Sequence, residues 1–142
     1  MRDLGQAKQL LVSGGYTCVI YKDGEQFTSE QRGVRPLVVW LNTDCNFSGF
    51  SAADKVVGKA TAFLYVLLGV KNLYARVLSK PALSVLETNG IKVEYEELVP
   101  NIINRSGTGM CPFEEVVFGE TDPATALELI LKKMHELQIP IS

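Results

Sequence analysis

The sequence is poor in the residues that most often bind metals or carry out nucleophilic catalysis. It has one histidine and three cysteines in 142 residues. Cys18, Cys45 and Cys111 lie at irregular positions, which match neither a disulfide framework nor the paired C-x-x-C pattern of zinc sites, so reduced thiols are expected. We expect His135, which is remote from every motif below, to lie on a solvated helix face. A Ser-His-Asp or Cys-His mechanism is therefore not expected, because each needs a histidine beside the nucleophile.

The chain also lacks a strong charge of one sign and a long apolar run. Its 14 Lys and Arg nearly balance 16 Asp and Glu. The chain has no long run of basic residues, which argues against nucleic acid as the main partner. The longest apolar run, 60–70, is too short for a membrane span of about 20 residues. The first residues lack the apolar segment of a signal peptide. We expect a cytoplasmic protein that binds neither nucleic acid nor membrane, and whose partner is a small molecule.

What the sequence does contain is enough apolar material for one folded domain, which we expect to span 1–142. Hydrophobic residues make up 46% of the chain. Periodicity and turn signals predict helices at 3–12, 33–41, 52–68, 81–88, 112–118 and 123–137, and strands at 16–21, 26–29, 72–78 and 91–95. The first two strands should form an antiparallel hairpin, and the last two a parallel pair. The fold class expected is α/β, with three α/β/α layers and a mixed sheet of about four strands.

The most informative motif is the glycine-rich segment 104–115, which delivers Cys111 to a predicted helix start. The positive end of a helix dipole lowers the pKa of a thiol, which favours a nucleophilic or redox role. A purely structural interpretation also fits, with Cys111 at the N-cap, Pro112 at N1 and Glu114 at N3. Glu114 and Glu115 would in addition oppose thiolate formation. Both interpretations remain open.

A second group of candidates lies at the head of the predicted third helix. Ser51 and Asp54 fit a capping box, which gives the carboxylate a structural role. Lys55 in a first helical turn opposes the dipole unless an anion is near. Lys59 follows at i+4, so the two lysines either hold one anionic ligand or form a solvated stripe. Gly58 inside a helix suggests that another backbone or a ligand approaches closely.

The element order and three segments, 51–60, 75–82 and 104–115, resemble an uncharacterised prokaryotic family assigned to the cytidine deaminase-like superfamily. The resemblance implies that fold and, frequently, a homo-oligomer. Zinc deaminases carry His-x-Glu and Pro-Cys-x-x-Cys at the starts of successive helices. The corresponding starts here, 53–56 and 79–83, lack those ligands, and Asp54 alone cannot hold zinc. We expect neither a zinc site nor another cofactor.

The candidate site combines these segments. Its catalytic candidates are Cys111, Lys55 and Asp54, and its ligand-binding candidates are Lys59, Asn104, Arg105, Thr108, Glu114 and Ser79. Asn104 and Arg105 would either orient a carboxylate or phosphate group of the ligand or attach their own loop to the sheet. Ser79 also fits an N-cap position, which is a structural role. The leading hypothesis is a small-molecule enzyme on a deaminase-like scaffold without zinc. Alternatives are a non-catalytic binding module for a nucleotide-like or other small anionic ligand, and a structural subunit.

Overall fold

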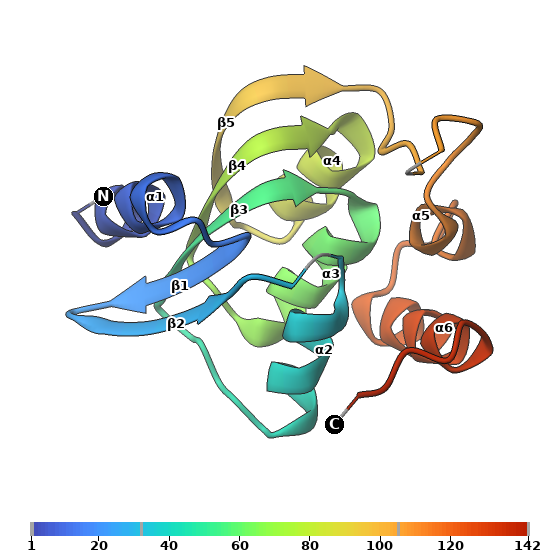
Figure 1. The fold of residues 1–142 in the computed structure, drawn as a ribbon, viewed down its shortest axis with the longest axis horizontal. Helices are drawn as coiled ribbons and strands as arrows, with labels where there is room; N and C mark the ends of the chain where they lie inside the picture. The colour runs from blue at the N-terminus through green and yellow to red at the C-terminus, as the bar shows by residue number, and fades with distance from the viewer. Residues whose placement is uncertain (1, 32, 105, 142) are drawn as a thin grey trace.

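The computed structural model describes residues 2–31, 33–104 and 106–141. Figure 1 shows the arrangement of the elements. In chain order they are α1 (Arg2–Gly14), β1 (Cys18–Lys22), β2 (Glu25–Ser29), α2 (Arg35–Asn42), β3 (Ser51–Val57), α3 (Lys59–Leu68), β4 (Asn72–Ser79), α4 (Lys80–Thr88), β5 (Lys92–Val99), α5 (Pro112–Val116) and α6 (Pro123–Glu136).

The strands form one mixed, open sheet in the order β2-β1-β3-β4-β5. β1 is antiparallel to both β2 and β3, whereas β3, β4 and β5 are parallel. The predicted hairpin is confirmed, and its turn places Asp23 and Gly24 at φ values of 48° and 89°, as a two-residue type I′ connection requires. The predicted parallel pairing of the last two strands is also confirmed. The sheet has five strands, so the expectation of about four is wrong.

The missing strand is β3, which occupies the start of the segment predicted as the third helix. Ser51–Val57 is extended, and α3 begins only at Lys59, after Gly58 in an extended N-cap conformation. A central strand covered on both faces shows no clean apolar alternation, so its pattern resembles that of a buried helix. The second predicted helix, by contrast, is confirmed as α2.

This change of structure corrects four expectations that depended on the helix. Ser51 and Asp54 form no capping box, because both lie within a strand. Lys55 does not oppose a helix dipole, and it shares no helix face with Lys59. Gly58 is not inside a helix but directly before one. Their roles therefore follow from the geometry of β3 and of its connection to α3.

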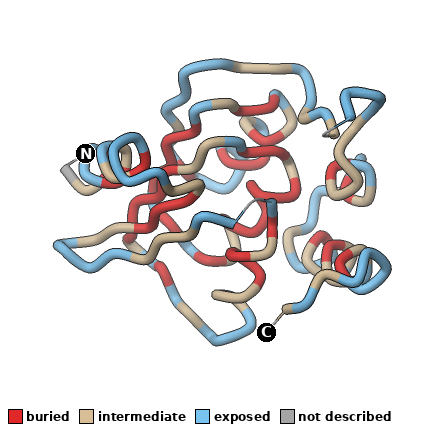
Figure 2. The backbone as a smooth tube through the Cα atoms, viewed as in Figure 1, coloured by how far each residue is buried: buried red, intermediate tan, exposed pale blue. Residues whose placement is uncertain are grey.

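Helices cover both faces of the sheet. α1 lies on one face, and α2, α3, α4 and α6 lie on the other (Figure 1). The larger apolar cluster fills the side that carries α3, and a smaller one, which includes Leu4, Ala7 and Tyr74, lies beneath α1. Buried residues concentrate in the middle of the sheet and in the helices facing it, whereas the edge strand β5 is largely exposed (Figure 2).

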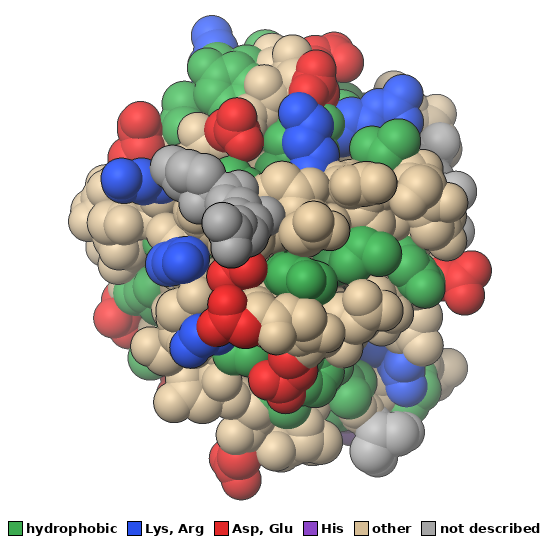
Figure 3. All heavy atoms as spheres, turned by 90° about the vertical axis from the view of Figure 1, so that its left-hand side faces the viewer, with side chains coloured by type: hydrophobic (Ala, Val, Ile, Leu, Met, Phe, Trp, Pro, Cys, Tyr) green, Lys and Arg blue, Asp and Glu red, His purple; other side chains and the backbone are tan. Residues whose placement is uncertain are grey.

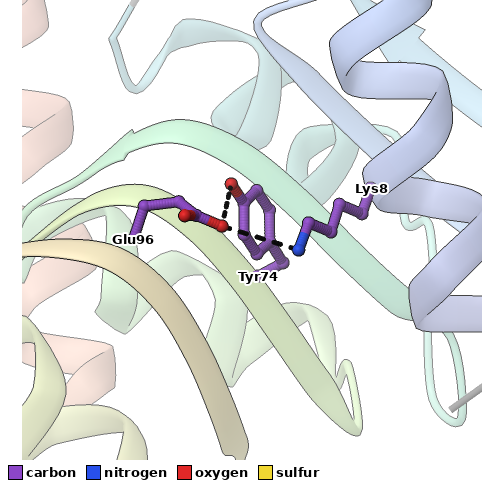
Figure 4. Close-up of polar contacts among 3 residues, drawn as sticks. All are labelled: Lys8, Tyr74 and Glu96. Atoms are coloured by element: carbon purple, nitrogen blue, oxygen red, sulfur yellow. Dashed lines mark hydrogen bonds and ion pairs between the residues drawn. The ribbon is translucent and has the colours of Figure 1, made fainter.

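A contact cluster fixes α1 across the sheet toward β5. Lys8 places its Nζ atom 4.7 Å from the ring centre of Tyr74 and 3.5 Å from Oε2 of Glu96. The Tyr74 hydroxyl donates a hydrogen bond to the same oxygen at 3.1 Å (Figure 4). The ion pair is solvent-exposed and contributes roughly 1 kcal/mol or less, so it orients α1 more than it stabilises the fold.

The outer surface on this side shows no strong charge of one sign. Acidic and basic side chains are interspersed over the face that carries α1 (Figure 3). In the part of the chain that the structure describes, no helix combines the length and the apolar character needed to cross a membrane.

Candidate functional site

A cavity of about 470 Å³ lies where β1, β3 and the start of α3 meet α5 and the segment before it. Four of the predicted site residues line it: Asp54, Lys55, Cys111 and Glu114. Gly58 and Thr61, from the start of α3, contribute to the same wall. The tertiary structure thus brings the two groups of candidates, separated by more than fifty positions in the sequence, to one cavity.

Asp54 is the carboxyl group with the most unusual surroundings in this cavity. It lies on β3 opposite Cys18 of β1, and its Oδ2 atom accepts a hydrogen bond from the Tyr65 hydroxyl at 2.6 Å. Burial raises the pKa of Asp54 to about 7, against the lowering effects of the hydrogen bonds from Tyr65 and from backbone amides. Among the described residues no lysine or arginine forms an ion pair with it. The carboxyl group therefore titrates in the neutral range and not near pH 4.

Tyr65 and Cys18 extend the hydrogen bonding of Asp54 into the core of the protein. The Cys18 Sγ atom lies 3.0 Å from the Tyr65 hydroxyl oxygen, and both side chains are buried. Because the single Tyr65 hydroxyl proton is donated to Asp54, the Cys18 thiol donates to the Tyr65 oxygen. Burial, with the nearby Asp54 charge, raises the pKa values of both groups well above their usual range. At neutral pH both groups are therefore uncharged: Tyr65 donates to the Asp54 carboxylate, and Cys18 donates to Tyr65.

Glu114 has a role that its own helix does not explain. Its carboxylate accepts hydrogen bonds from the backbone amides of Lys59 at 2.7 Å and Ala60 at 2.9 Å. These are unpaired donors at the start of α3, so Glu114 caps that helix from α5. Burial raises the pKa of Glu114, partly offset by these two amides and by the Lys59 charge. A Cβ atom on Gly58 would lie 2.6 Å from the Glu114 carboxyl group, which explains why glycine is needed there.

Cys111 occupies the predicted N-cap position, with Pro112 following at the helix start. Its side chain makes no capping hydrogen bond, and it is partly buried in the wall of the cavity. The backbone amide of Cys111 donates to the Ile102 carbonyl oxygen at 3.0 Å, which closes the preceding loop. α5 has five residues, so the dipole that acts on the thiol is that of a short helix.

Asn104 and Thr108 are held by contacts within their own loop. Asn104 donates a hydrogen bond from Nδ2 to Thr108 Oγ1 at 3.2 Å, and its Oδ1 accepts from the Thr108 amide and the Ser106 hydroxyl. These bonds shape the loop and leave the two side chains outside the wall of the first cavity. Arg105, the third loop candidate, lies outside the described residues.

The remaining candidates lie apart from the cavity. Lys59 begins α3 and places its Nζ atom 5.8 Å from the ring centre of Phe63. Ser79 is fully buried, and its Oγ accepts from the Ala82 amide at 3.1 Å, which confirms the predicted N-cap. Neither residue belongs to the cavity wall. His135 is exposed on α6, as expected.

Sequence reasoning missed Tyr65, and it gave Cys18 no role beyond that of a reduced thiol. Tyr65 lies in an apolar helix that is buried, so its hydroxyl group needs a hydrogen-bond partner inside the protein. That need was the signal in the sequence that could have indicated a polar contact at Tyr65. Within the described ranges, no group of three or more His, Cys, Asp or Glu side chains is arranged to hold a metal ion.

Comparisons with known proteins identify relatives. Residues 6–134 match the family described as "TM1506: Domain of unknown function (DUF1893)". A crystal structure of a DUF1893 family protein, TM1506 from Thermotoga maritima, is similar with a TM-score of 0.86 and 30% sequence identity. The similarity covers 93% of this chain and 90% of that one. Among curated proteins no significant match was found. The extent of the family match shows that this chain belongs to the DUF1893 family.

Proposed function

We propose that the protein is a small-molecule enzyme in which Asp54 acts as a general acid and base within the first cavity. The observation that carries the proposal is the Asp54 carboxyl group in the cavity wall, held at 2.6 Å by Tyr65 and with a pKa raised to about 7. A proton-transfer group is most effective when its pKa is near the working pH. Perturbed carboxyl groups in clefts are frequently functional.

The neighbouring residues define the proposed roles. Ionised Asp54 takes a proton from a bound substrate, and the neutral carboxyl group then returns one to the product. Tyr65 is a positioning residue, because its hydroxyl group fixes the orientation of the carboxylate. Lys55, from the same strand, offers a positive charge where negative charge develops on the substrate. Cys111 faces this cavity as a second proton donor or nucleophile.

The deaminase-like scaffold remains part of the proposal. Its support is the order of the elements, in which α1 and a hairpin precede α2 and the parallel strand-helix-strand units. With β3 assigned as a strand, the helices that would correspond to the ligand-bearing ones start at Arg35 and Lys59. Neither start carries histidine or cysteine, and both border the first cavity, through Val34 and Gly58 respectively. We therefore propose that the reaction takes place at the edge of the sheet where these two helices start, and that it uses a carboxyl group where the zinc deaminases use a metal ion.

The alternative, a binding module for a nucleotide-like or other small anionic ligand, has weaker support. Lys55 favours it, because this residue carries the only positive charge among the described residues that line the cavity. However, the amides at the start of α3, which would otherwise attract an anion, already bind the carboxylate of Glu114. Two carboxyl groups in the wall also disfavour a negative ligand.

The proposal is tested by measuring the pKa of Asp54 and by screening for ligands. Carbon-13 NMR of the side-chain carboxyl should give a pKa near 7, and a value near 4 would remove the basis of the proposal. A thermal-shift screen of amines, nucleosides and organic acids should find compounds that stabilise the wild type but not Asp54→Asn. Asp23→Asn, in the exposed hairpin turn, is the matched control and should respond like the wild type. Turnover of a compound found in this way should follow a group titrating near pH 7.

A further inference from the structure

A second cavity, of about 890 Å³, adjoins the first. The two share part of their walls, including Val34, Cys111 and Phe113. Cys111 and Phe113 come from the start of α5, so this short helix separates the two spaces. The shared residues place the two spaces side by side at the start of α5.

The two cavities differ in chemistry. Asp54, Lys55 and Glu114 line only the first, whereas Ile103, Leu137 and Ile139 line only the second. Ile103 and Leu137 are 55% and 45% exposed, so they leave apolar surface in contact with water. Covering such surface with an apolar group is favourable in free energy.

Among the described residues that line the second cavity, the charged one is Arg35, and its side chain is already engaged. Arg35 donates from Nε to the Pro140 carbonyl oxygen at 2.7 Å and from a terminal nitrogen to Gln31 Oε1 at 2.6 Å. These bonds direct the guanidinium group toward the protein, so the described part of the second cavity offers mainly apolar contacts.

We infer that the ligand is a two-part molecule, with a nitrogen-bearing polar head in the first cavity and an apolar or aromatic extension in the second. This inference rests on the proposed function and names the class of substrate for the same site. The head is assigned from the Asp54 carboxylate. It accepts hydrogen bonds from Tyr65 at Oδ2 and from the Val56 amide at Oδ1, and its remaining lone pairs can accept from a ligand N–H. A protonated amine would in addition neutralise its charge. The extension is assigned from the apolar wall and from the shared residues Cys111 and Phe113.

The test uses a series of amines that differ only in the length of the extension. Benzylamine, 3-phenylpropylamine and 5-phenylpentylamine are titrated into the protein at pH 8 and followed by amide chemical shifts in NMR. Each methylene that becomes buried contributes roughly fourfold in affinity, so the longest amine should bind at least tenfold more tightly than benzylamine. Leu137→Ser and Ile103→Ser should abolish most of this gain without weakening benzylamine.

Phe118→Ser provides the matched control, because Phe118 is 74% exposed and belongs to neither cavity. It should leave the whole series unchanged. If benzylamine binds through Asp54 but chain length has no effect, the inference is overturned while the proposed function stands. If no amine binds, or if the matching carboxylates bind more tightly, the assigned head group is wrong. Tight carboxylate binding that is lost in Lys55→Ala would favour the anion-binding alternative instead.

Discussion

The hydroxyl group of Tyr65, on α3, donates a 2.6 Å hydrogen bond to Oδ2 of Asp54, on β3. The bond connects a core helix to the one carboxyl group of the cavity wall whose pKa is raised to about 7. Burial and this hydrogen bond act in opposite directions on the pKa, because burial favours the neutral acid and the hydrogen bond favours the carboxylate. The two effects can be separated by substitution.

Tyr65→Phe should raise the pKa of Asp54 above 7. The substitution keeps the buried ring but removes the donor that stabilises the carboxylate. Carbon-13 NMR titration of the Asp54 carboxyl measures the change. Tyr95→Phe, on the edge strand β5 and outside the cavity wall, is the control and should leave the pKa unaltered. An unchanged or lower pKa in Tyr65→Phe would show that the hydroxyl does not support the charge.

Asp54→Asn should flatten the dependence of stability on pH. The pKa of Asp54 is about 7 in the folded state and near 3.8 in the unfolded state. Between these values the unfolded chain releases its proton while the folded chain retains it, so the free energy of unfolding falls as pH rises from about 4 to 7.

The loss in the wild type should be about 2 kcal/mol, less than the full shift implies because the carboxyl group keeps some contact with solvent. Urea unfolding at pH 4, 5.5 and 8 measures it. Asp54→Asn should lack most of this slope and be relatively more stable at pH 8. The same slope in both proteins would mean that another group is responsible.

Gly58→Ala and Glu114→Ala should both destabilise the fold, and their effects should not add. The alanine methyl would lie 2.6 Å from a carboxyl group that two amides hold in place. Removing Glu114 leaves those two donors without a partner, at a cost of about 2 kcal/mol.

In the double variant the new methyl group occupies space that the carboxyl has vacated, so its cost should be smaller than in the wild type. Chemical denaturation of the four proteins gives the coupling energy. Strict additivity would contradict the contact between the two residues. Gly5→Ala, whose added Cβ meets no atom within 4 Å, is the control and should not destabilise the protein.

Cys18 should react with iodoacetamide at least tenfold more slowly than Cys45 and Cys111. It is buried, and its pKa is raised, so both access and the thiolate fraction are low. Cys45 and Cys111 are partly exposed. Mass spectrometry of the three peptides over time gives the rates, and unfolding in urea should make them equal. Rapid modification of Cys18 in the folded protein would contradict its hydrogen bond to Tyr65. If Cys111 reacts no faster than a free thiol at pH 7, its catalytic role is wrong.

Local signals in the sequence were sufficient where neighbouring residues decide the structure. The Asp23-Gly24 turn, the Ser79 cap and the start of α5 at Cys111 and Pro112 each follow from the chemistry of a few adjacent residues. Such turns and caps depend on backbone conformations that particular side chains favour, whatever surrounds them. The same reasoning directed attention to Asp54, Lys55, Cys111 and Glu114, which line one cavity.

Only the tertiary structure decided what those residues do. Ser51–Val57 became a strand because it lies between β1 and β4, and no local pattern specified those neighbours. The same placement puts Asp54 opposite Cys18 and within hydrogen-bond distance of Tyr65, where burial raises the pKa of Asp54. Glu114 likewise caps α3, whose first residues lie more than fifty positions earlier in the chain. Sequence alone determined the candidates, whereas burial and long-range hydrogen bonds, which depend on packing, determined their chemistry.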